Sequence, residues 1–384
     1  MRYYLLLCSL FFISLVGCKK TAKVSIPGEI ISISPVSDPG TLNISDYLTD
    51  IRFIPLQTND SCLLSSTLNL KVNDNRIYIS NKQAIVYFDD TGKFISKIKH
   101  QGRGPFEYVS LTDFVVLKDN KIAVLDNAKK RLIIYDLTKR NSLKTIDLGC
   151  FSRACEMVND SIIVVTADYY KPDDLFHFYN IPTSKKIKSC TPLHQQKLSY
   201  CHIMGHRYFT KQGNTLLYSE PFNPDILKVS LDTVLTRYHI STPSNPPEDF
   251  YMTEFNDVRE FIEEFKRKKY VATGGNFAVG ENYLLTSFNA CPAAKYCFIE
   301  LQTSRNFNFK SIYLPGNIEI ENFQIIPLND GEICIVIPAI ELCGKSVDQP
   351  FSNIAETDNP ILCIYGHEIE MYTVEQGEKR DKRQ

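Results

Sequence analysis

The sequence contains no tryptophan, very little helical periodicity and none of the short motifs that mark the common hydrolases. Aromatic packing depends on 21 Tyr and 23 Phe residues, in a chain that is 43% hydrophobic and long enough to bury a large core. The nucleophile pattern G-x-S-x-G and the zinc pattern H-E-x-x-H do not occur. Composition and motifs therefore leave the catalytic residues unknown, if the protein has any.

Neither the charge nor the cysteine spacing points to a nucleic-acid-binding or zinc protein. The 43 Lys and Arg residues balance 44 Asp and Glu residues, so no basic excess favours nucleic acid as a partner. None of the 12 cysteines forms a C-x2-C pair, the usual start of a structural zinc site. Cys150 and Cys155 are the closest candidates for a short-loop disulfide, but spacing leaves the pairing open.

The N-terminus has the layout of a secretory signal. Its apolar run, from about Leu5 to Val16, is shorter than the roughly 20 residues that a membrane-spanning helix needs. The run ends in Leu15-Val16-Gly17-Cys18, which resembles a bacterial lipobox. The resemblance implies a signal peptide over residues 1–17, cleaved before a Cys18 that carries diacylglycerol. The alternative is a plain N-terminal helix with a buried cysteine.

The residues after the cysteine bear on location. Surface-exported lipoproteins of gut-type bacteria carry acidic residues there, whereas this chain has Lys19, Lys20 and Lys23. We therefore expect a lipid-anchored outer-membrane protein that faces the periplasm rather than the cell surface, with membrane lipid as a partner through acylated Cys18. Residues 18–49 are expected to form the lipidated N-terminus and a linker.

Six segments of the chain share a polar turn followed by a strand. Their Asn, Asp and Gly residues tolerate the positive φ of tight hairpins. We align the six segments on one apolar residue that follows each turn. Successive aligned residues are then 45, 40, 54, 67 and 50 residues apart. The aligned residues are Ile77, Ile122, Ile162, Leu216, Tyr283 and Ile333.

Each turn–strand unit is followed by a third apolar segment, such as "AIVYFDD" after the first unit and "RLIIYDL" after the second. Several strands per unit at this spacing are typical of propeller blades. The sequence thus predicts an all-β, six-bladed β-propeller over residues 50–374. A sandwich or a pair of β-domains is the alternative, but neither would repeat one strand order six times.

Residues 92–136 resemble an NHL repeat. The positions that fit are Gly92, Lys93, Phe94, Gly102, Gly104, Pro105, Asp126, Arg131, Tyr135 and Asp136. The segment departs from the pattern at Phe106, where glycine is usual, and at Tyr108, where phenylalanine is usual.

The whole chain resembles the six-bladed propeller lipoproteins of Bacteroides-type bacteria. It shares with them the lipobox, an I-P-L strand at Ile54-Pro55-Leu56 and a G-x-G-P-x-E-[YF] loop at residues 102–108. This resemblance implies an architecture and no activity.

Three further expectations concern the ends of the propeller and one insertion. The strand at residues 50–57 should close the ring beside the strands of residues 361–374, because an open last blade would expose a sheet edge. Residues 244–269 predict a helical insertion between blades 4 and 5, either a lid over the channel or a helix packed on its own blades. The charged tail, residues 375–384, has no apolar residues.

The stretch "KHQGRGPFEY" is the first candidate site. Gly-Lys-Ser/Thr is missing, so it is not a Walker loop, and its place between two repeats predicts a link between blades. Glycines there would supply unusual backbone angles. Because such links border the channel mouth, Arg103 could bind an anionic ligand with Glu107 and Tyr108 as polar partners.

The second candidate is a histidine pair, His202 and His206. Their spacing suits a metal on a helix, but Gly205 makes a helix unfavourable there, so the alternative is two loop histidines. No cofactor is predicted, and a divalent metal at this histidine pair is kept as the alternative.

Two functions remain open at this stage. The first is a non-catalytic binding or scaffold module for a glycan, peptide or protein partner. The second is a hydrolase or lyase with its active site at the central channel, in which His202, His206, Arg103 or Glu107 would act. The fold hosts both classes and does not separate them.

Overall fold

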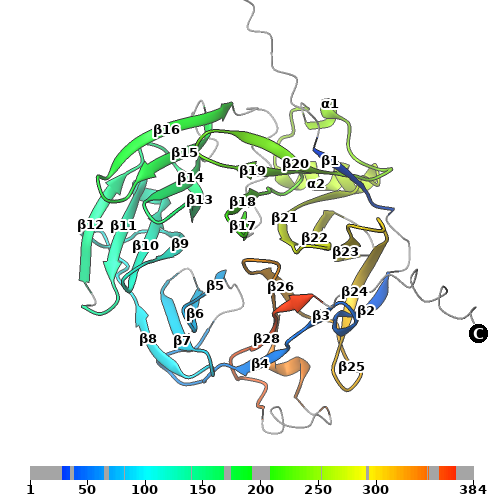
Figure 1. The fold of residues 1–384 in the computed structure, drawn as a ribbon, viewed down its shortest axis with the longest axis horizontal. Helices are drawn as coiled ribbons and strands as arrows, with labels where there is room; N and C mark the ends of the chain where they lie inside the picture. The colour runs from blue at the N-terminus through cyan, green and yellow to red at the C-terminus, as the bar shows by residue number, and fades with distance from the viewer. Residues whose placement is uncertain are drawn as a thin grey trace, which may run out of the picture.

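The chain folds into a ring of β-sheets (Figure 1). The computed structural model describes residues 28–34, 39–64, 69–81, 83–139, 141–167, 174–192, 208–251, 253–290, 294–343, 345 and 354–368. Within these residues, six sheets of four or more strands stand as blades around one axis. The predicted all-β, six-bladed propeller is confirmed.

Blades 1 to 3 are four-stranded and antiparallel, with the first strand innermost. Their strands are β5 (Asn69–Asn73), β6 (Arg76–Ser80), β7 (Ile85–Asp89), β8 (Phe94–Ile98), β9 (Leu111–Leu117), β10 (Lys121–Asp126), β11 (Arg131–Asp136), β12 (Asn141–Asp147), β13 (Ser152–Met157), β14 (Ile162–Ala167), β15 (Asp174–Asn180) and β16 (Lys185–Pro192).

Blades 4 to 6 follow the same plan and carry added strands from the N-terminus. Their own strands are β17 (Phe209–Gln212), β18 (Thr215–Tyr218), β19 (Asp225–Val229), β20 (Val234–Ser241), β21 (Ala272–Val279), β22 (Tyr283–Ala290), β23 (Tyr296–Glu300), β24 (Asn306–Leu314), β25 (Ile318–Ile320), β26 (Gln324–Pro327), β27 (Ile333–Ile337) and β28 (Ile361–Tyr365).

The aligned turns of the sequence fall at equivalent places in the ring. Each of the six aligned apolar residues lies in the second strand of its blade, from β6 to β27. In blade 1 the turn residues Asp74 and Asn75 have φ of 48° and 56°, and in blade 2 Asp119 and Asn120 have φ of 59° and 54°. These are the left-handed conformations that a two-residue hairpin turn needs, which is why Asn and Asp recur there.

Ring closure occurs as predicted. Strand β4 (Arg52–Pro55) pairs antiparallel with β28 and becomes the outermost strand of blade 6. Ile54 lies opposite Leu362 in this pairing and is 4% exposed. The first and last parts of the chain therefore share one sheet.

The residues before β4 also belong to the sheets. Strand β1 (Glu29–Ser32) pairs parallel with β20 of blade 4, and β2 (Gly40–Asn43) pairs parallel with β24 of blade 5. Strand β3 (Leu48–Thr49), after the 3-10 turn η1 (Ile44–Asp46), pairs with β29 (His367–Glu368). In the stretch assigned to a linker, β1 and β2 are thus built into blades 4 and 5, and β3 pairs with β29.

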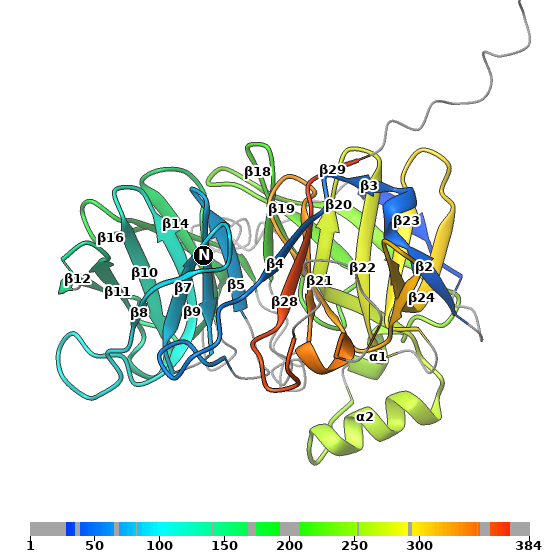
Figure 2. The same cartoon turned by 90° about the horizontal axis from the view of Figure 1, so that it is seen from below.

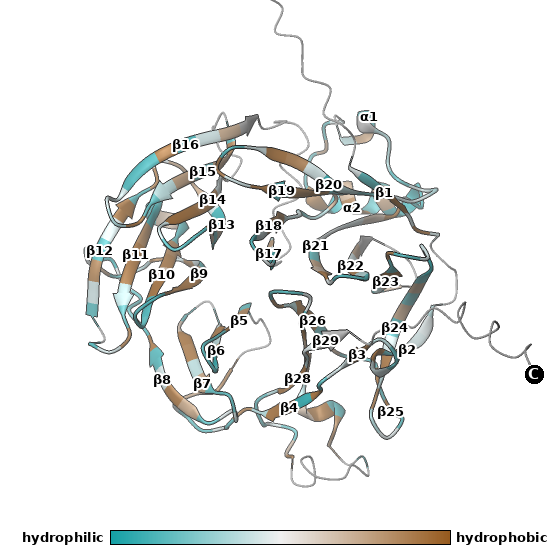
Figure 3. Ribbon diagram, in the orientation of Figure 1, coloured by the Kyte–Doolittle hydropathy of each residue, from teal (hydrophilic) through white to brown (hydrophobic). Residues whose placement is uncertain are grey.

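Apolar side chains fill the spaces between neighbouring blades. One cluster joins Val124 of blade 2 to Tyr87 of blade 1, and the next joins Ile134 of blade 2 to Val165 of blade 3. Figure 3 shows hydrophobic colouring along middle strands such as β10 and β14, with more hydrophilic stretches on the outer strands β12 and β16. Interdigitation of these faces makes the ring one rigid scaffold.

Successive strands of a blade run in opposite directions, so the loops between them lie alternately on the two faces of the ring. We call "link face" the side that carries residues 99–110, 127–130 and 242–271, and "turn face" the side of the first hairpins, such as residues 74–75. The helical insertion is confirmed on the link face, with α1 (Glu248–Tyr251) and α2 (Val258–Arg267). Figure 2 shows both helices projecting from that side, while β3 and β29 lie on the opposite side.

Candidate functional site

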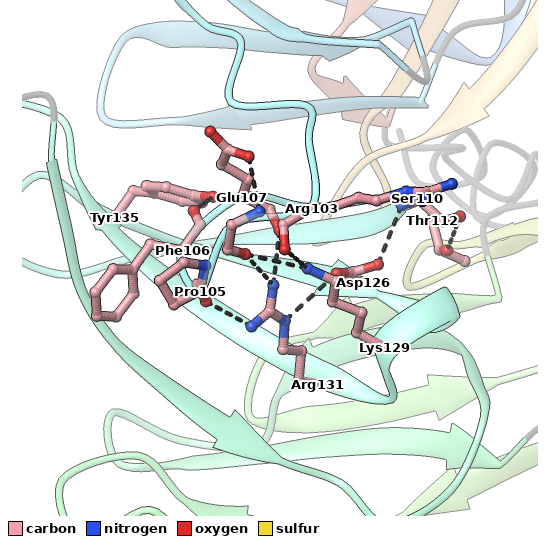
Figure 4. A network of polar contacts seen from close by, with 11 residues as sticks. Arg103, Pro105, Phe106, Glu107, Ser110, Thr112, Asp126, Lys129, Arg131 and Tyr135 are labelled. Carbon is pink, nitrogen blue, oxygen red and sulfur yellow. Dashed lines mark hydrogen bonds and ion pairs between the residues drawn. The ribbon is translucent and has the colours of Figure 1, made fainter.

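The link between blades 1 and 2, residues 99–110, is held by a cation from the next hairpin. Arg131, at the start of β11, donates from its guanidinium to the carbonyl oxygens of Pro105 at 2.5 Å and Glu107 at 2.6 Å. Its Nε lies 3.4 Å from the carboxylate of Asp126, which is fully buried. Lys129 donates to the carbonyl of Arg103 at 2.8 Å. Figure 4 shows Arg131 at the centre of this network.

Two tyrosines fix the same link from its buried side. The Tyr135 hydroxyl donates to the carbonyl of Phe106 at 2.7 Å, and the Tyr108 hydroxyl donates to the carbonyl of Gln83 at 2.7 Å. Burial raises the pKa of Tyr108 to about 12 and raises the pKa of Tyr135 as well, so both hydroxyls stay neutral donors.

The structure separates the three residues proposed to bind a ligand in this link. Tyr108 is fully buried, whereas Arg103 and Glu107 are exposed. The Glu107 carboxylate accepts from the backbone N–H of Gly104 at 2.8 Å. In Figure 4 the side chains of Arg103 and Glu107 point in different directions. Of the three, Arg103 and Glu107 can reach solvent, but they do not form one clamp.

The glycines of this link serve a different purpose from the one expected. Gly102 and Gly104 do not have positive φ. A Cβ at Gly102 would lie 2.0 Å from the Glu107 carboxylate, and one at Gly104 would lie 3.0 Å from it. The two glycines leave room for the Glu107 carboxylate to fold back over the backbone, and unusual backbone angles are not the reason for them.

Several predicted residues lie outside the described residues: Cys18, His202 and His206, together with the signal peptide and the tail. Among the residues that the structure does describe, no group of three or more His, Cys, Asp or Glu side chains could hold a metal ion. In the same part of the chain Cys150 and Cys155 are both free thiols. No helix there is long and apolar enough to cross a membrane.

Charged side chains meet at the inner edge of blades 1 to 3. Lys71 on β5 donates to Glu156 on β13 at 2.9 Å, and each side chain is 9% exposed. This pair joins blades 1 and 3 and crosses blade 2, where the Lys71 ammonium lies 5.7 Å from the centre of the Phe114 ring. Sequence reasoning missed this pair, since 85 residues separate its members.

Asp113 on β9 forms a second junction beside that pair. One carboxylate oxygen accepts from the side chain of Asn69 in blade 1 at 2.8 Å. The other accepts from the backbone N–H of Cys155 in blade 3 at 2.8 Å. Asp113 therefore joins three blades, because both of its carboxylate oxygens accept hydrogen bonds from neighbouring blades.

Blades 4 and 6 also meet directly at their inner strands. The Thr210 hydroxyl of β17 donates to the carbonyl of Leu328 at 2.7 Å, and the backbone N–H of Asp330 donates to the carbonyl of Lys211 at 2.7 Å. Like the Lys71–Glu156 pair, these bonds skip the blade between the two partners. The Lys71–Glu156 pair and these two hydrogen bonds therefore connect blades near the axis of the ring.

The helical insertion has its own aromatic core. Phe261 and Phe265 of α2 are buried against Phe250, Phe222 of blade 4 and Ala272 of blade 5. The Asp257 side chain caps α2 by accepting from the N–H of Glu260, as an N-cap should. Figure 1 shows α2 at the rim over blades 4 and 5 and away from the axis, which agrees with a helix packed on its own blades.

An open pocket of about 400 Å³ lies between α1 and α2. The rings of Phe250 and Phe255 line it together with Glu254, Glu260, Glu263 and Lys268. Apart from these two rings the lining is polar and mostly charged, so the pocket suits a small polar ligand more than an apolar one.

A family model covers almost the whole ring. It matches residues 29–366, from β1 to the end of β28, and is described as a domain of unknown function, DUF4934. The chain belongs to this family. The match contains every blade, the N-terminal strands and the helical insertion.

One solved structure shares the fold of this chain. A Bacteroides fragilis protein, described as a candidate exported protein, has a TM-score of 0.68 at 20% identity over 87% of this chain and 98% of its own. At 20% identity this likeness concerns the fold alone. Virginiamycin B lyase from Staphylococcus aureus has a TM-score of 0.43 at 12% identity, over 83% of this chain and 99% of its own. A search of curated proteins finds no significant match.

Replacing Arg131 by alanine is expected to loosen the link between blades 1 and 2. The change removes the bonds to Pro105 and Glu107 and leaves the buried Asp126 without its cation. We expect a loss of about 2–4 kcal/mol of unfolding free energy in denaturant titration. Arg103→Ala, in the same link but exposed, should change it by less than about 0.5 kcal/mol. Equal effects of the two variants would contradict this assignment.

Proposed function

We propose that this protein is a lipid-anchored lipoprotein of the cell envelope, whose propeller binds a glycan, peptide or protein partner without turning it over. The exported neighbour of the same fold and the lipobox-like Leu15-Val16-Gly17-Cys18 support the location. The NHL-like residues Asp126, Arg131 and Tyr135 support a repeat of that type, since all three hold the link between blades.

The observation that carries the binding function is the pocket between α1 and α2. Its aromatic floor is anchored to blades 4 and 5 through Phe222 and Ala272, so the pocket belongs to a rigid scaffold. The inner-edge carboxylates of Asp113 and Glu156 support the same function. They are engaged in bonds between blades instead of facing a substrate.

The proposal is tested by screening the purified protein against glycan arrays and a peptide library. Hits are then measured with Glu254→Lys and Glu263→Lys, which invert the charge of the pocket rim, and with Asp90→Lys on the turn face as the matched control. We expect the affinity for the ligand to fall at least about tenfold in the rim variants and to stay unchanged in the control. Mass spectrometry should recover the ligand intact.

Two results would overturn the proposal. A ligand that is chemically converted by the wild-type protein would support the hydrolase or lyase instead. A ligand whose affinity responds to Arg103→Ala, and not to the rim variants, would move the binding site to the link between blades 1 and 2.

A further inference from the structure

One large apolar side chain is exposed on each of three strands: β12 and β16, the edge strands of blades 2 and 3, and β20 of blade 4, which β1 covers in part. Leu143 on β12 is 42% exposed, Ile187 on β16 is 45% exposed and Leu235 on β20 is 52% exposed. Leu143 and Ile187 lie where the pairing register shifts, between Ser142 and Lys144 and between Lys186 and Lys188. A bulge turns the extra residue out of the sheet, so both side chains are displayed by backbone geometry.

Cations surround these apolar residues. The strands contribute five: Lys144 from β12, three lysines from the run Lys185–Lys188 of β16, and Arg237 from β20. Asp147 is the single carboxylate in the three strands. We call this surface, made of Leu143, Lys144, Lys185–Lys188, Leu235 and Arg237, the outer band.

The outer band is continuous from blade to blade. The Lys144 ammonium donates to the carbonyl of Pro182, at 3.1 Å, in the turn that leads into β16. In the same way Lys188 donates to the carbonyl of Leu231, at 2.9 Å, in the turn before β20. Each lysine bridges the gap to the next blade, so the apolar residues lie along one basic strip.

Lysines on the edge of a sheet have an ordinary explanation, since they discourage pairing with another chain. That explanation does not account for the apolar residues, because exposed Leu and Ile on an edge favour association. Apolar side chains set among lysines are instead the composition of surfaces that bind anionic membranes: ammonium groups meet the headgroups while apolar groups enter the boundary below them.

The chain enters the ring beside this band. Glu29, the first residue of β1, lies 3.8 Å from Arg237, and Ile30 is 63% exposed. Nine residues lie between Cys18 and Gly28, so the two can be at most about 35 Å apart when the chain is fully extended. A lipid on Cys18 is therefore within reach of the outer band at Arg237.

We propose that the outer band binds the surface of a membrane that contains anionic phospholipid, next to the acylated Cys18. The relation to the anchor rests on the proposed lipoprotein, whereas recognition of the lipid surface rests on the band alone. Contact through the rim would set the ring edge-on to the bilayer. Both faces of the ring, and the pocket between α1 and α2, would then remain accessible to a partner.

The experiment is flotation with vesicles of phosphatidylcholine, with or without phosphatidylglycerol. It uses the chain from residue 18 with Cys18→Ser, which keeps every described strand and carries no acyl group. We expect binding only to the vesicles with phosphatidylglycerol, and weaker binding as salt is raised. Lys185→Glu with Lys186→Glu, two exposed lysines without a described hydrogen bond, should lower the affinity about tenfold or more.

The matched control is Lys266→Glu with Lys269→Glu, two exposed lysines of the helical insertion, which should keep the wild-type affinity. Equal binding to neutral vesicles, or equal loss in both double variants, would overturn the proposal. So would binding to soluble dextran sulfate without binding to vesicles, which would indicate an acidic polymer as the partner. Because no acyl group or pocket ligand is used, failure here is distinct from failure of the proposed function.

Discussion

Deleting residues 24–57 is expected to abolish the cooperative thermal melting of the protein. The deletion removes β1, β2 and β3 together with β4, whose loss leaves the edge of β28 unpaired and opens the sixth blade. It also removes Ile54 and Leu56, each 4% exposed, from the apolar cluster that joins blade 6 to blade 1. Each blade of the ring packs against two neighbouring blades. Opening one blade therefore weakens two interfaces between blades, and the whole propeller should lose stability. Circular dichroism against temperature measures this.

A point variant separates closure from the general effect of a truncation. Ile54→Asp places a carboxylate in the buried space opposite Leu362 and should cost about 4 kcal/mol or more. Ile30→Asp is the matched control, since Ile30 also lies in an N-terminal strand but is 63% exposed. It should melt like the wild type. A truncated protein that still melts cooperatively at the wild-type temperature would contradict closure by β4.

The blades were predictable because their signals are local. A turn such as Asp74-Asn75 requires positive φ at adjacent residues, and few residue types accept it, so the requirement is visible in the sequence. Pairing between distant strands has no such signal. Strand β1 joins β20 about 200 residues later through backbone hydrogen bonds, which any sequence of suitable polarity can make.

The candidate site shows the same limit at the level of side chains. Arg103, Glu107 and Tyr108 are close in sequence, but Tyr108 turns into the core between blades while the other two stay outside. Arg131 was visible as part of the repeat pattern, yet its bond to Glu107, 24 residues earlier, depends on how the hairpin folds over the link. Spacing identified the residues and could not assign their contacts.

Replacing Lys71 by methionine is expected to destabilise the ring by about 3–5 kcal/mol. Methionine has a similar volume, so the main consequence is that Glu156, whose side chain is 9% exposed in the wild type, loses the Lys71 ammonium. Glu156→Leu should be costly for the converse reason. The double variant Lys71→Met with Glu156→Leu removes both charges and should recover most of the loss, with a coupling energy of about 2–3 kcal/mol. Denaturant unfolding of the four proteins measures the cycle.

The surface pair Lys118–Asp160 provides the control for burial. Its charged atoms are 2.6 Å apart, but the two side chains are 71% and 70% exposed, and the pair also joins neighbouring blades. Lys118→Met should leave the unfolding midpoint unchanged, because water solvates Asp160 once the lysine is gone. A loss for Lys71→Met no larger than that for Lys118→Met would mean that the inner pair does not hold blades 1 and 3. A large loss that the double variant fails to recover would assign the effect to other contacts of Lys71.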